Sequence, residues 1–288
     1  MPIPPILETI LECIEPSSSF TGALPRVTSS SGATYFVKLG RPSEKEQYEG
    51  ESESLRLFDR SSPGIAPKLF VNGIDESTER PYMISEYIDV KSSSLSSHGG
   101  AEYLAKKLAT EVHSLSSENG KFGFSIPTYC GVTRIENGWY DTWEEAYGKM
   151  IGGLLDGIER EGRDPRGELV KMGKEVITRA IPHLLGPRLK CTPSFLHGDL
   201  WSGNVAISTR TSKPFIYDPS SYFGHNEADL SIARIFEGFP RAFYETYHQY
   251  RTKSEPVEEY EQRADLYELF HYLNHMLVFG VSLKGEAQ

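Results

Sequence analysis

The sequence predicts an α+β protein of two lobes, a small lobe built on an antiparallel sheet and a larger lobe that is mainly helical. Three segments have the residue types of β-strands, namely residues 34–38, 67–71 and 81–88. From residue 100 onward, apolar residues recur mostly at the three- and four-residue spacing of helices. The 288 residues, 38% of them hydrophobic, suit one two-lobed unit with a sizeable core. We therefore expect an N-terminal lobe over residues 1–88 and a C-terminal lobe over residues 89–288.

The composition excludes several classes of protein. A formal net charge of -10 argues against nucleic-acid binding, which needs a basic face for phosphate contacts. Cys13, Cys130 and Cys191 are far apart and odd in number, so they indicate neither a disulfide framework nor a zinc motif, and they favour a reducing compartment. The apolar runs are far shorter than a membrane span. We expect a cytoplasmic protein without a nucleic-acid or membrane partner, and the sequence leaves the oligomeric state open.

The most informative polar pattern lies in residues 195–204, which read Phe-Leu-His-Gly-Asp-Leu-Trp-Ser-Gly-Asn. Asp199 and Asn204 have the spacing that the kinase loop H-R-D-L-x-x-x-N gives to its base and its metal-binding Asn, and His197 fits the same frame. A later apolar run leads to Asp218. Each match alone is also typical of an ordinary turn or strand end. Together they predict Asp199 as the base of a phosphoryl transfer and Asn204 with Asp218 as magnesium ligands.

The residues around this pattern indicate a kinase for small molecules. Asp218 is followed by Pro219 and Ser220, where a protein kinase has Phe and Gly. Gly198 replaces the Arg that would read a phosphorylated activation loop. Regulation of that form is therefore not expected.

Four longer segments resemble the fructosamine/ketosamine-3-kinase family, and the resemblance spans most of residues 35–280. They are residues 197–204, 216–225, 236–241 and 272–275. The resemblance implies a two-lobed protein-kinase-like fold, which aminoglycoside phosphotransferases share, with ATP and Mg²⁺ as cofactors. It also implies phosphorylation of the third-carbon hydroxyl of a ketosamine, a ketose joined to a protein lysine or a small amine. The product is unstable and sheds its sugar, so the implied outcome is deglycation.

The N-terminal lobe begins with a segment that predicts a short amphipathic helix, residues 3–14. The resemblance places a nucleotide-covering loop next, but Gly22 stands alone where G-x-G-x-x-G is expected, and Pro25 removes an amide. The alternative is an ordinary hairpin with its turn at residues 30–32. The two interpretations are compatible, because a loop that covers the nucleotide can itself be a hairpin. The family's loop often carries a cysteine where this chain has Thr21.

A lysine and a glutamate of this lobe are expected to form an ion pair. The strand alternation puts Phe36 and Lys38 on one face. Ser43 and Glu46 have the spacing of a capping box, which predicts a helix from there to about Arg60.

In that helix Glu51 lies on the apolar stripe formed by Tyr48, Leu55 and Phe58. A carboxylate on a buried face is costly unless it is paired, and Lys38 is its natural partner. The pair would match the one that positions nucleotide phosphates in kinases. The alternative is that Glu51 reaches solvent beside its charged neighbours.

The strand over residues 81–88 precedes a polar, serine-rich stretch, as expected for a strand that leaves the small lobe. The resemblance places the adenine-binding hinge there, at Glu86, Tyr87 and Ile88, with Met83 behind them. Without the resemblance this segment would indicate only a buried strand.

Residues that contact the acceptor are expected in the C-terminal lobe. Trp201 is the best candidate for a platform under the sugar, and its alternative role is an anchor in the core. Further candidates are His197, His225, Glu227, Tyr272 and His275. His271 and His275 are spaced as metal ligands can be, but the Glu of H-E-x-x-H is absent, so no zinc site is expected there. His113 is more typical of a structural histidine.

Two other functions stay open. One is an aminoglycoside or choline phosphotransferase, for which Glu227 and Asp229 would supply an acidic acceptor pocket. The other is a nucleotide-binding scaffold without catalysis, suggested by the glycine-poor loop. Retention of the residues predicted for catalysis, metal binding and the ion pair argues against the scaffold.

Overall fold

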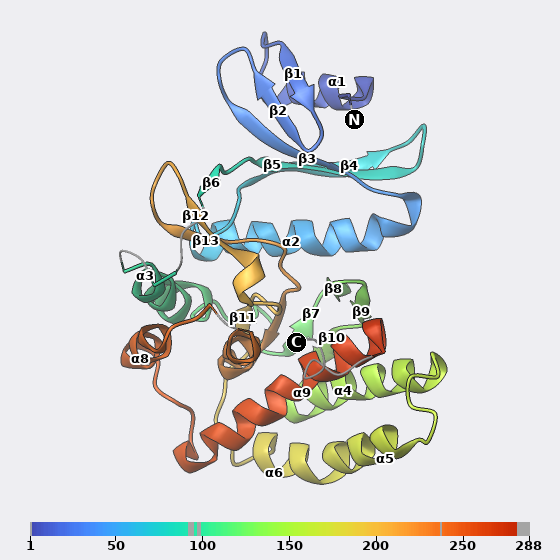
Figure 1. Ribbon diagram of the computed structural model, residues 1–288, viewed down its shortest axis with the longest axis vertical. Helices are drawn as coiled ribbons and strands as arrows, with labels where there is room; N and C mark the ends of the chain where they lie inside the picture. The colour runs from blue at the N-terminus through green and yellow to red at the C-terminus, as the bar shows by residue number, and fades with distance from the viewer. Residues whose placement is uncertain (1, 92–94, 97–98, 237, 281–288) are drawn as a thin grey trace, which may run out of the picture.

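A computed structural model describes residues 2–91, 95–96, 99–236 and 238–280 of the chain. An antiparallel sheet with two helices forms one end of the molecule, and most helices gather at the other end (Figure 1). The strand order in the sheet is β1-β2-β3-β5-β4. Its strands are β1 (Phe20–Ala23), β2 (Arg26–Ser29), β3 (Thr34–Leu39), β4 (Leu69–Asp75) and β5 (Arg80–Glu86).

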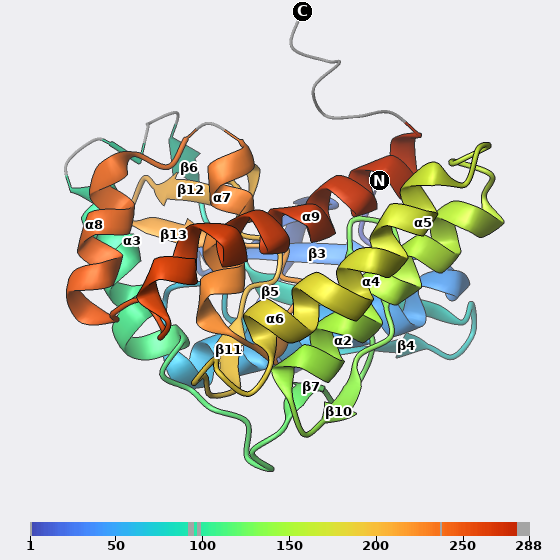
Figure 2. The same ribbon diagram turned by 90° about the horizontal axis from the view of Figure 1, so that it is seen from below.

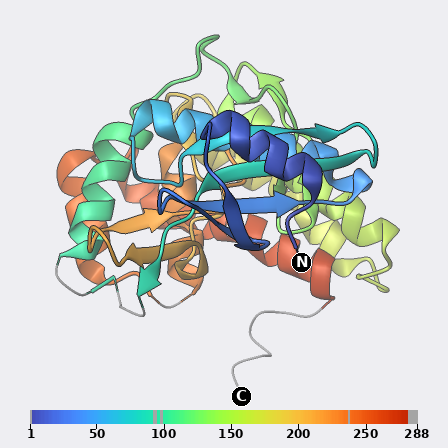
Figure 3. The same cartoon turned by 90° about the horizontal axis from the view of Figure 1, so that it is seen from above.

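Helices cover both faces of this sheet. Helix α1 (Pro5–Ile14) buries Leu7 and Leu11 completely, and they pack in a small apolar cluster with residues of β2, β3 and β5. Figure 3 shows α1, in dark blue, lying over the strands. Helix α2 (Lys45–Ser61) lies between the sheet and the helical part of the molecule (Figure 1).

The main apolar core joins the two parts. Leu55 and Phe58 of α2 belong to the same buried cluster as the helices of the larger part. The ring of Phe58 lies 4.8 Å from that of Phe195 and 5.8 Å from that of His197, measured between centroids. The small lobe therefore packs directly on the strand that leads into the predicted catalytic loop. The division at residue 88 falls shortly after β5 and stays a prediction.

The larger part consists of two groups of helices, which Figure 2 shows from below. Helices α4, α5, α6 and α9 lie side by side, and α3 packs with α8 beside them. The helices are α3 (Gly100–Lys107), α4 (Trp143–Arg160), α5 (Glu168–Glu175), α6 (Ile181–Leu185), α7 (Ile232–Ile235), α8 (Arg241–Tyr250) and α9 (Tyr260–Phe279). Wider π-turns, Leu108–Val112 and Val176–Ala180, extend α3 and α5, and single 3-10 turns cover Pro42–Glu44, Ser202–Asn204, Asn226–Leu230 and Val257–Glu259.

Short strands position the predicted catalytic residues between these groups. Their sheets have the orders β10-β7-β14-β11, β13-β12-β6 and β8-β9. Strand β11 leads into Asp199, and β13 leads into Asp218. The strands are β6 (Val90–Lys91), β7 (Phe122–Phe124), β8 (Thr128–Cys130), β9 (Thr133–Ile135), β10 (Gly138–Tyr140), β11 (Ser194–Leu196), β12 (Val205–Ser208), β13 (Pro214–Ile216) and β14 (Tyr222–Gly224). No helix within the described ranges is long and apolar enough to cross a membrane.

The predicted capping box of α2 is wrong. The backbone N–H of Arg41 donates to the carboxylate of Glu44 at 2.7 Å, so the box forms before the helix and not at Ser43. The carboxylate of Glu46 instead accepts from Arg134 and from the hydroxyl of Tyr129, at 2.7 Å and 2.8 Å. Glu46 therefore binds Arg134 and Tyr129, which are distant in sequence, and does not cap the helix at Ser43.

Candidate active site

A buried carboxylate, Asp229, holds the predicted catalytic loop in place. Its two oxygens accept the backbone N–H groups of His197 and Gly198, both at 2.8 Å. His113 lies 3.1 Å from the same carboxylate. Burial opposes ionisation of Asp229, but these donors outweigh it and hold the pKa below its ordinary value. The sequence had suggested Asp229 only for an acceptor pocket, and its 2% exposure excludes it from one.

His113 and His197 are structural parts of the same network. Burial lowers the pKa of both rings, so both are neutral. The N–H of Asp199 donates to Nδ1 of His197 at 3.2 Å, which leaves Nε2 to donate to the carbonyl oxygen of Tyr217 at 3.0 Å. The His113 ring bridges Asp229 and the hydroxyl of Tyr247. The predicted structural role of His113 is confirmed, and His197, which is fully buried, shapes the loop.

Gly198 allows the loop to dock on the segment that carries Asp218. Its φ angle is +82°, and a β-carbon would lie 2.0 Å from the carbonyl oxygen of Ser220. The N–H of Ser220 donates to the carbonyl oxygen of His197 at 2.9 Å. This contact fixes the catalytic loop relative to Asp218.

Asp199 lies on the exposed side of this loop and is held by Asn204. The amide of Asn204 donates to the Asp199 carboxylate at 3.1 Å and to its backbone carbonyl at 2.9 Å. Burial raises the pKa of Asp199 to about 6, although hydrogen bonds from Asn204 and Cys130 favour the ionised form. Asp199 is thus oriented, and it is still ionised near neutral pH.

The predicted pair of Lys38 and Glu51 forms, and it includes Asp218. The Lys38 ammonium lies 2.7 Å from Glu51 and 3.2 Å from Asp218. Burial lowers the pKa of Lys38, but the two carboxylates outweigh it and raise the pKa above its ordinary value. The pKa of Glu51 is raised by burial, which the charge of Lys38 partly offsets. The Asp218 side chain is 58% exposed, so it faces solvent beside the pair.

Oxygen atoms suitable for a hard cation remain beside this pair. Asn204 uses its amide N–H₂ on Asp199, and Asp218 uses one oxygen on Lys38. Within the described residues no hydrogen bond reaches Oδ1 of Asn204 or Oδ2 of Asp218. Amide and carboxylate oxygens are the donors that Mg²⁺ prefers, so these two residues fit the ion.

Comparison with known proteins decides the family. A family model described as fructosamine kinase matches residues 21–288. The chain belongs to the fructosamine kinase family. A ketosamine-3-kinase of Mus musculus is 33% identical over 280 residues, which cover 88% of this chain and 85% of its relative. A chloroplastic protein-ribulosamine 3-kinase of Arabidopsis thaliana is 34% identical over 257 residues, covering 88% and 74%.

Solved structures confirm the predicted protein-kinase-like fold. A putative fructosamine-3-kinase from Haemophilus somnus has a TM-score of 0.76 at 21% identity, covering 94% of this chain and 89% of the other. A choline kinase from Streptococcus pneumoniae has a TM-score of 0.60 at 16% identity, covering 96% and 89%. The second likeness extends to a different kinase class, so it concerns the fold alone.

Of the residues predicted for the hinge of this family member, Glu86 ends β5, and Tyr87 and Ile88 follow it. Met83 is 1% exposed and lies opposite Lys38 in the sheet. The backbone N–H of Tyr87 donates to Thr34 at 3.3 Å, so the β-sheet already uses this donor. Glu86 accepts from Arg210 at 2.9 Å. Adenine binding by Glu86, Tyr87 and Ile88 stays a prediction.

Both hairpins considered for the covering loop are present. One joins β1 to β2 through Leu24 and Pro25, and the other joins β2 to β3 through residues 30–33. Gly22 lies on β1, whose last three residues are exposed. This family member therefore has a hairpin where a cover would be, and its contact with phosphate stays a prediction.

Three predicted acceptor residues, His197, His225 and Glu227, lie in the protein core. His225 contacts the hydroxyls of Tyr267 and Ser254, both at 2.8 Å, and is fully buried. Glu227 is 2% exposed and pairs with Arg263 at 2.8 Å. With their polar atoms occupied and no access to solvent, none of the three can receive a sugar, and we propose no acceptor role for them.

The remaining acceptor candidates are partly buried. Trp201 packs against Phe236, with ring centroids 5.3 Å apart, and borders the main core. Tyr272 and His275 lie on α9, and the His275 ring is 4.6 Å from that of Phe279. Contact of these three with an acceptor stays a prediction.

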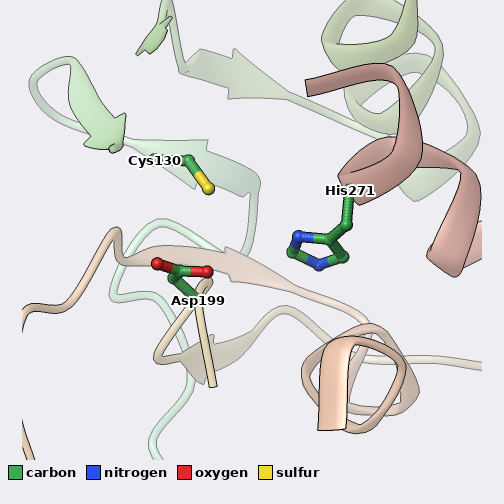
Figure 4. Close-up of side chains that lie close together, drawn as sticks. All are labelled: Cys130, Asp199 and His271. Atoms are coloured by element: carbon green, nitrogen blue, oxygen red, sulfur yellow. The ribbon is translucent and has the colours of Figure 1, made fainter. Parts of the chain in front are cut away.

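Sequence reasoning missed two side chains beside Asp199, namely Cys130 and His271. Figure 4 shows them from β8 and α9, with the thiol and the imidazole directed toward the Asp199 carboxylate. One ligand atom from each of the three lies within 4.8 Å of the others. The three positions are far apart in sequence, so no spacing could have revealed the cluster.

Proposed function

We propose that this protein is an ATP-dependent kinase that phosphorylates the third-carbon hydroxyl of ketosamines. Its acceptors are ribulosamine or fructosamine adducts on protein lysines or free amines, and the reaction leads to deglycation. The observation that carries the proposal is the arrangement of Asp199, Asn204 and Asp218 beside the pair of Lys38 and Glu51, in a chain of the fructosamine kinase family.

Asp199 is the base in this proposal. Its carboxylate is held by Asn204 and has a pKa of about 6, so near neutral pH it can accept the proton of the attacking hydroxyl. The transition state of phosphoryl transfer is loose, so the protein contributes mainly positioning and charge stabilisation. The catalytic loop supplies the positioning, because Asp229 binds the backbone amides just before Asp199.

The nucleotide is held from both lobes. Asn204 and Asp218 would hold Mg²⁺, which neutralises charge on the nucleotide phosphates when bound. Lys38, oriented by Glu51, contacts the phosphates. Met83, Glu86, Tyr87 and Ile88 border the adenine, and the hairpin with Gly22 covers the phosphates.

The alternative of an aminoglycoside or choline kinase is less well supported. Its acidic acceptor pocket would draw on Glu227 and Asp229, but both are buried and occupied by protein partners. A scaffold without catalysis is disfavoured, because base, metal ligands and ion pair are all present. The lobe boundary, the cytoplasmic location and the absence of nucleic-acid or membrane partners stay part of the proposal.

The test is ATP turnover by the purified full chain against a panel of acceptors. Ribulose-, erythrulose- and fructose-linked lysine derivatives are compared with choline and an aminoglycoside. We expect ADP formation with a ketosamine, a mass gain of one phosphoryl group on it, and later loss of the sugar. Asp199→Asn is the control for contaminating kinases. Turnover confined to choline or the aminoglycoside would contradict the proposal.

A further inference from the structure

Cys130 and His271 form a polar cluster with the base Asp199, and the proposed phosphoryl transfer uses neither of these two side chains. Their ligand atoms, a sulfur, a carboxylate oxygen and a ring nitrogen, all lie within 4.8 Å of one another (Figure 4). The side chains come from β8, the catalytic loop and α9, three packed elements of one core. Cys130 is 4% exposed and His271 is 8% exposed. The fold itself therefore brings the three groups together.

The His271 imidazole lacks a hydrogen-bond partner. Among the residues that the structure describes, no hydrogen bond reaches either ring nitrogen, although the side chain is more than nine-tenths buried. Neither nitrogen is among the fully enclosed atoms that lack a partner in this part of the chain, so the ring is open to a ligand at the cluster. Burial lowers the pKa of His271 to about 3, which keeps the ring neutral and able to donate a lone pair to a metal.

Cys130 is also oriented for coordination. The amide of Asn274 donates to its sulfur at 3.2 Å, and the thiol bonds to the Asp199 carboxylate. Oδ1 of Asn274 is buried without a partner in the described part of the chain. A water molecule on a metal at the cluster could donate to this oxygen. The cluster thus has a polar surrounding of the kind that orients metal ligands.

The chemical types of the three ligand atoms determine which metal ion fits the cluster. Thiolate, imidazole and carboxylate together suit Zn²⁺ and related ions, whereas Mg²⁺ prefers oxygen donors only. In a tetrahedral zinc site the ligand atoms are about 3.5 Å apart, so closing the cluster requires shifts of about 1 Å. Zn²⁺ with one thiolate, one carboxylate and one neutral imidazole carries no net charge, which suits a buried site.

We propose that Cys130, Asp199 and His271 bind Zn²⁺ or a similar thiophilic divalent cation, and that its binding inhibits the kinase. On binding, the Cys130 thiol loses its proton to solvent, the metal gains bonds to sulfur, nitrogen and oxygen, and no oxidation state changes. Asp199 is then a metal ligand and cannot accept the acceptor's proton. The inhibition rests on the proposed function, but the binding does not.

Binding is tested with Co²⁺ on the full chain, because thiolate-bound Co²⁺ gives a sulfur-to-cobalt absorption band and tetrahedral Co²⁺ gives visible bands. We expect both bands, and their removal by Zn²⁺. Cys130→Ser should abolish the sulfur band, and His271→Gln should weaken binding by at least about tenfold to a hundredfold. Cys191→Ser and His183→Gln are the matched controls and should bind as wild type. Thermal melts identify any variant that fails to fold.

Inhibition is tested separately, at saturating Mg²⁺ and ATP. Zn²⁺ should inhibit the wild type, a zinc-selective chelator should restore turnover, and His271→Gln should need at least about tenfold more Zn²⁺. Equal zinc sensitivity in that variant would place the inhibitory ion at Asn204 and Asp218 and overturn the inhibition. A wild type without the sulfur band would overturn the site. If no ketosamine is phosphorylated, the proposed function fails, while the cobalt bands still decide the site.

Discussion

The catalytic loop and the β1–β2 hairpin, the predicted nucleotide cover, are held in different ways. The loop has its backbone amides fixed by the buried Asp229 and its turn packed against Ser220. The hairpin lies at the edge of its sheet and is held mainly by strand pairing, and the last residues of β1 are exposed. We infer that the protein fixes the predicted catalytic groups more firmly than the hairpin predicted to cover the nucleotide. Changes in the loop should then affect turnover, and changes in the hairpin should affect nucleotide binding.

The largest effect is expected at the base. Asp199→Asn keeps the shape of the side chain but removes the proton acceptor, so turnover should fall by roughly a hundredfold or more. Nucleotide affinity, measured by calorimetry, should stay nearly unchanged. An unaltered turnover number would remove Asp199 from the mechanism.

The next largest effect is expected at the metal. Asp218→Ala removes the charged ligand, and the neutral amide of Asn204 cannot replace it, so magnesium-dependent ATP binding should weaken. Calorimetry with and without Mg²⁺ separates this effect from a general loss of affinity. If the variant binds Mg²⁺-ATP as tightly as the wild type, Asp218 is not a metal ligand.

Lys38 and Glu51 should behave as one unit that joins the small lobe to the cleft. Lys38→Ala and Glu51→Ala should each lose most activity, because each leaves a poorly solvated charge and releases the hold on the phosphates. The double variant should be little worse than the worse single variant. The measurement is kcat/KM for all four proteins, with thermal melts as the check on folding. Multiplicative losses would mean that the two residues act independently.

Asp229→Asn tests how far anchoring of the loop matters. An amide can accept through one oxygen only, so one buried donor among His197, Gly198 and His113 loses its partner. We expect the free energy of unfolding to drop by about 1 to 3 kcal/mol and turnover to drop by about tenfold. Asp265→Asn, on an exposed side chain, is the control. A variant with lower stability but full turnover would show that anchoring serves folding alone.

The smallest effect is expected in the hairpin. Gly22 has a φ angle of +116°, and a β-carbon there would lie 2.7 Å from the carbonyl oxygen of Arg26. Gly22→Ala should therefore distort the hairpin and raise the KM for ATP a few-fold, roughly, with kcat almost unchanged. A loss of kcat as large as that of Asp229→Asn would show that the hairpin also takes part in the chemical step.

Contacts could be predicted from the sequence where the two residues are close together in the chain or where a local pattern required a partner. Asp199 and Asn204 lie five residues apart, so a motif could place them together, and the apolar stripe around Glu51 required a buried partner. The α+β class and the helix ending near Arg60 were predictable for the same reason, since periodicity is local.

Contacts between distant segments were not predictable. No sequence pattern around Asp229 indicates that it binds the backbone amides of His197 and Gly198. Glu46 had a suitable local partner and took a tertiary one, and Glu227, proposed for the acceptor, is neutralised by Arg263 from another helix.

The close contact between Gly198 and Ser220 also restricts how this protein can evolve. A protein kinase has Arg at the position of Gly198 and uses it to sense a phosphorylated loop. No β-carbon fits here at 2.0 Å from the Ser220 carbonyl, so a single substitution to Arg would displace the segment that carries Asp218. Acquiring that form of regulation would require simultaneous changes in two motifs. The first step toward control by a phosphorylated loop, a single Gly198→Arg substitution, is therefore sterically blocked.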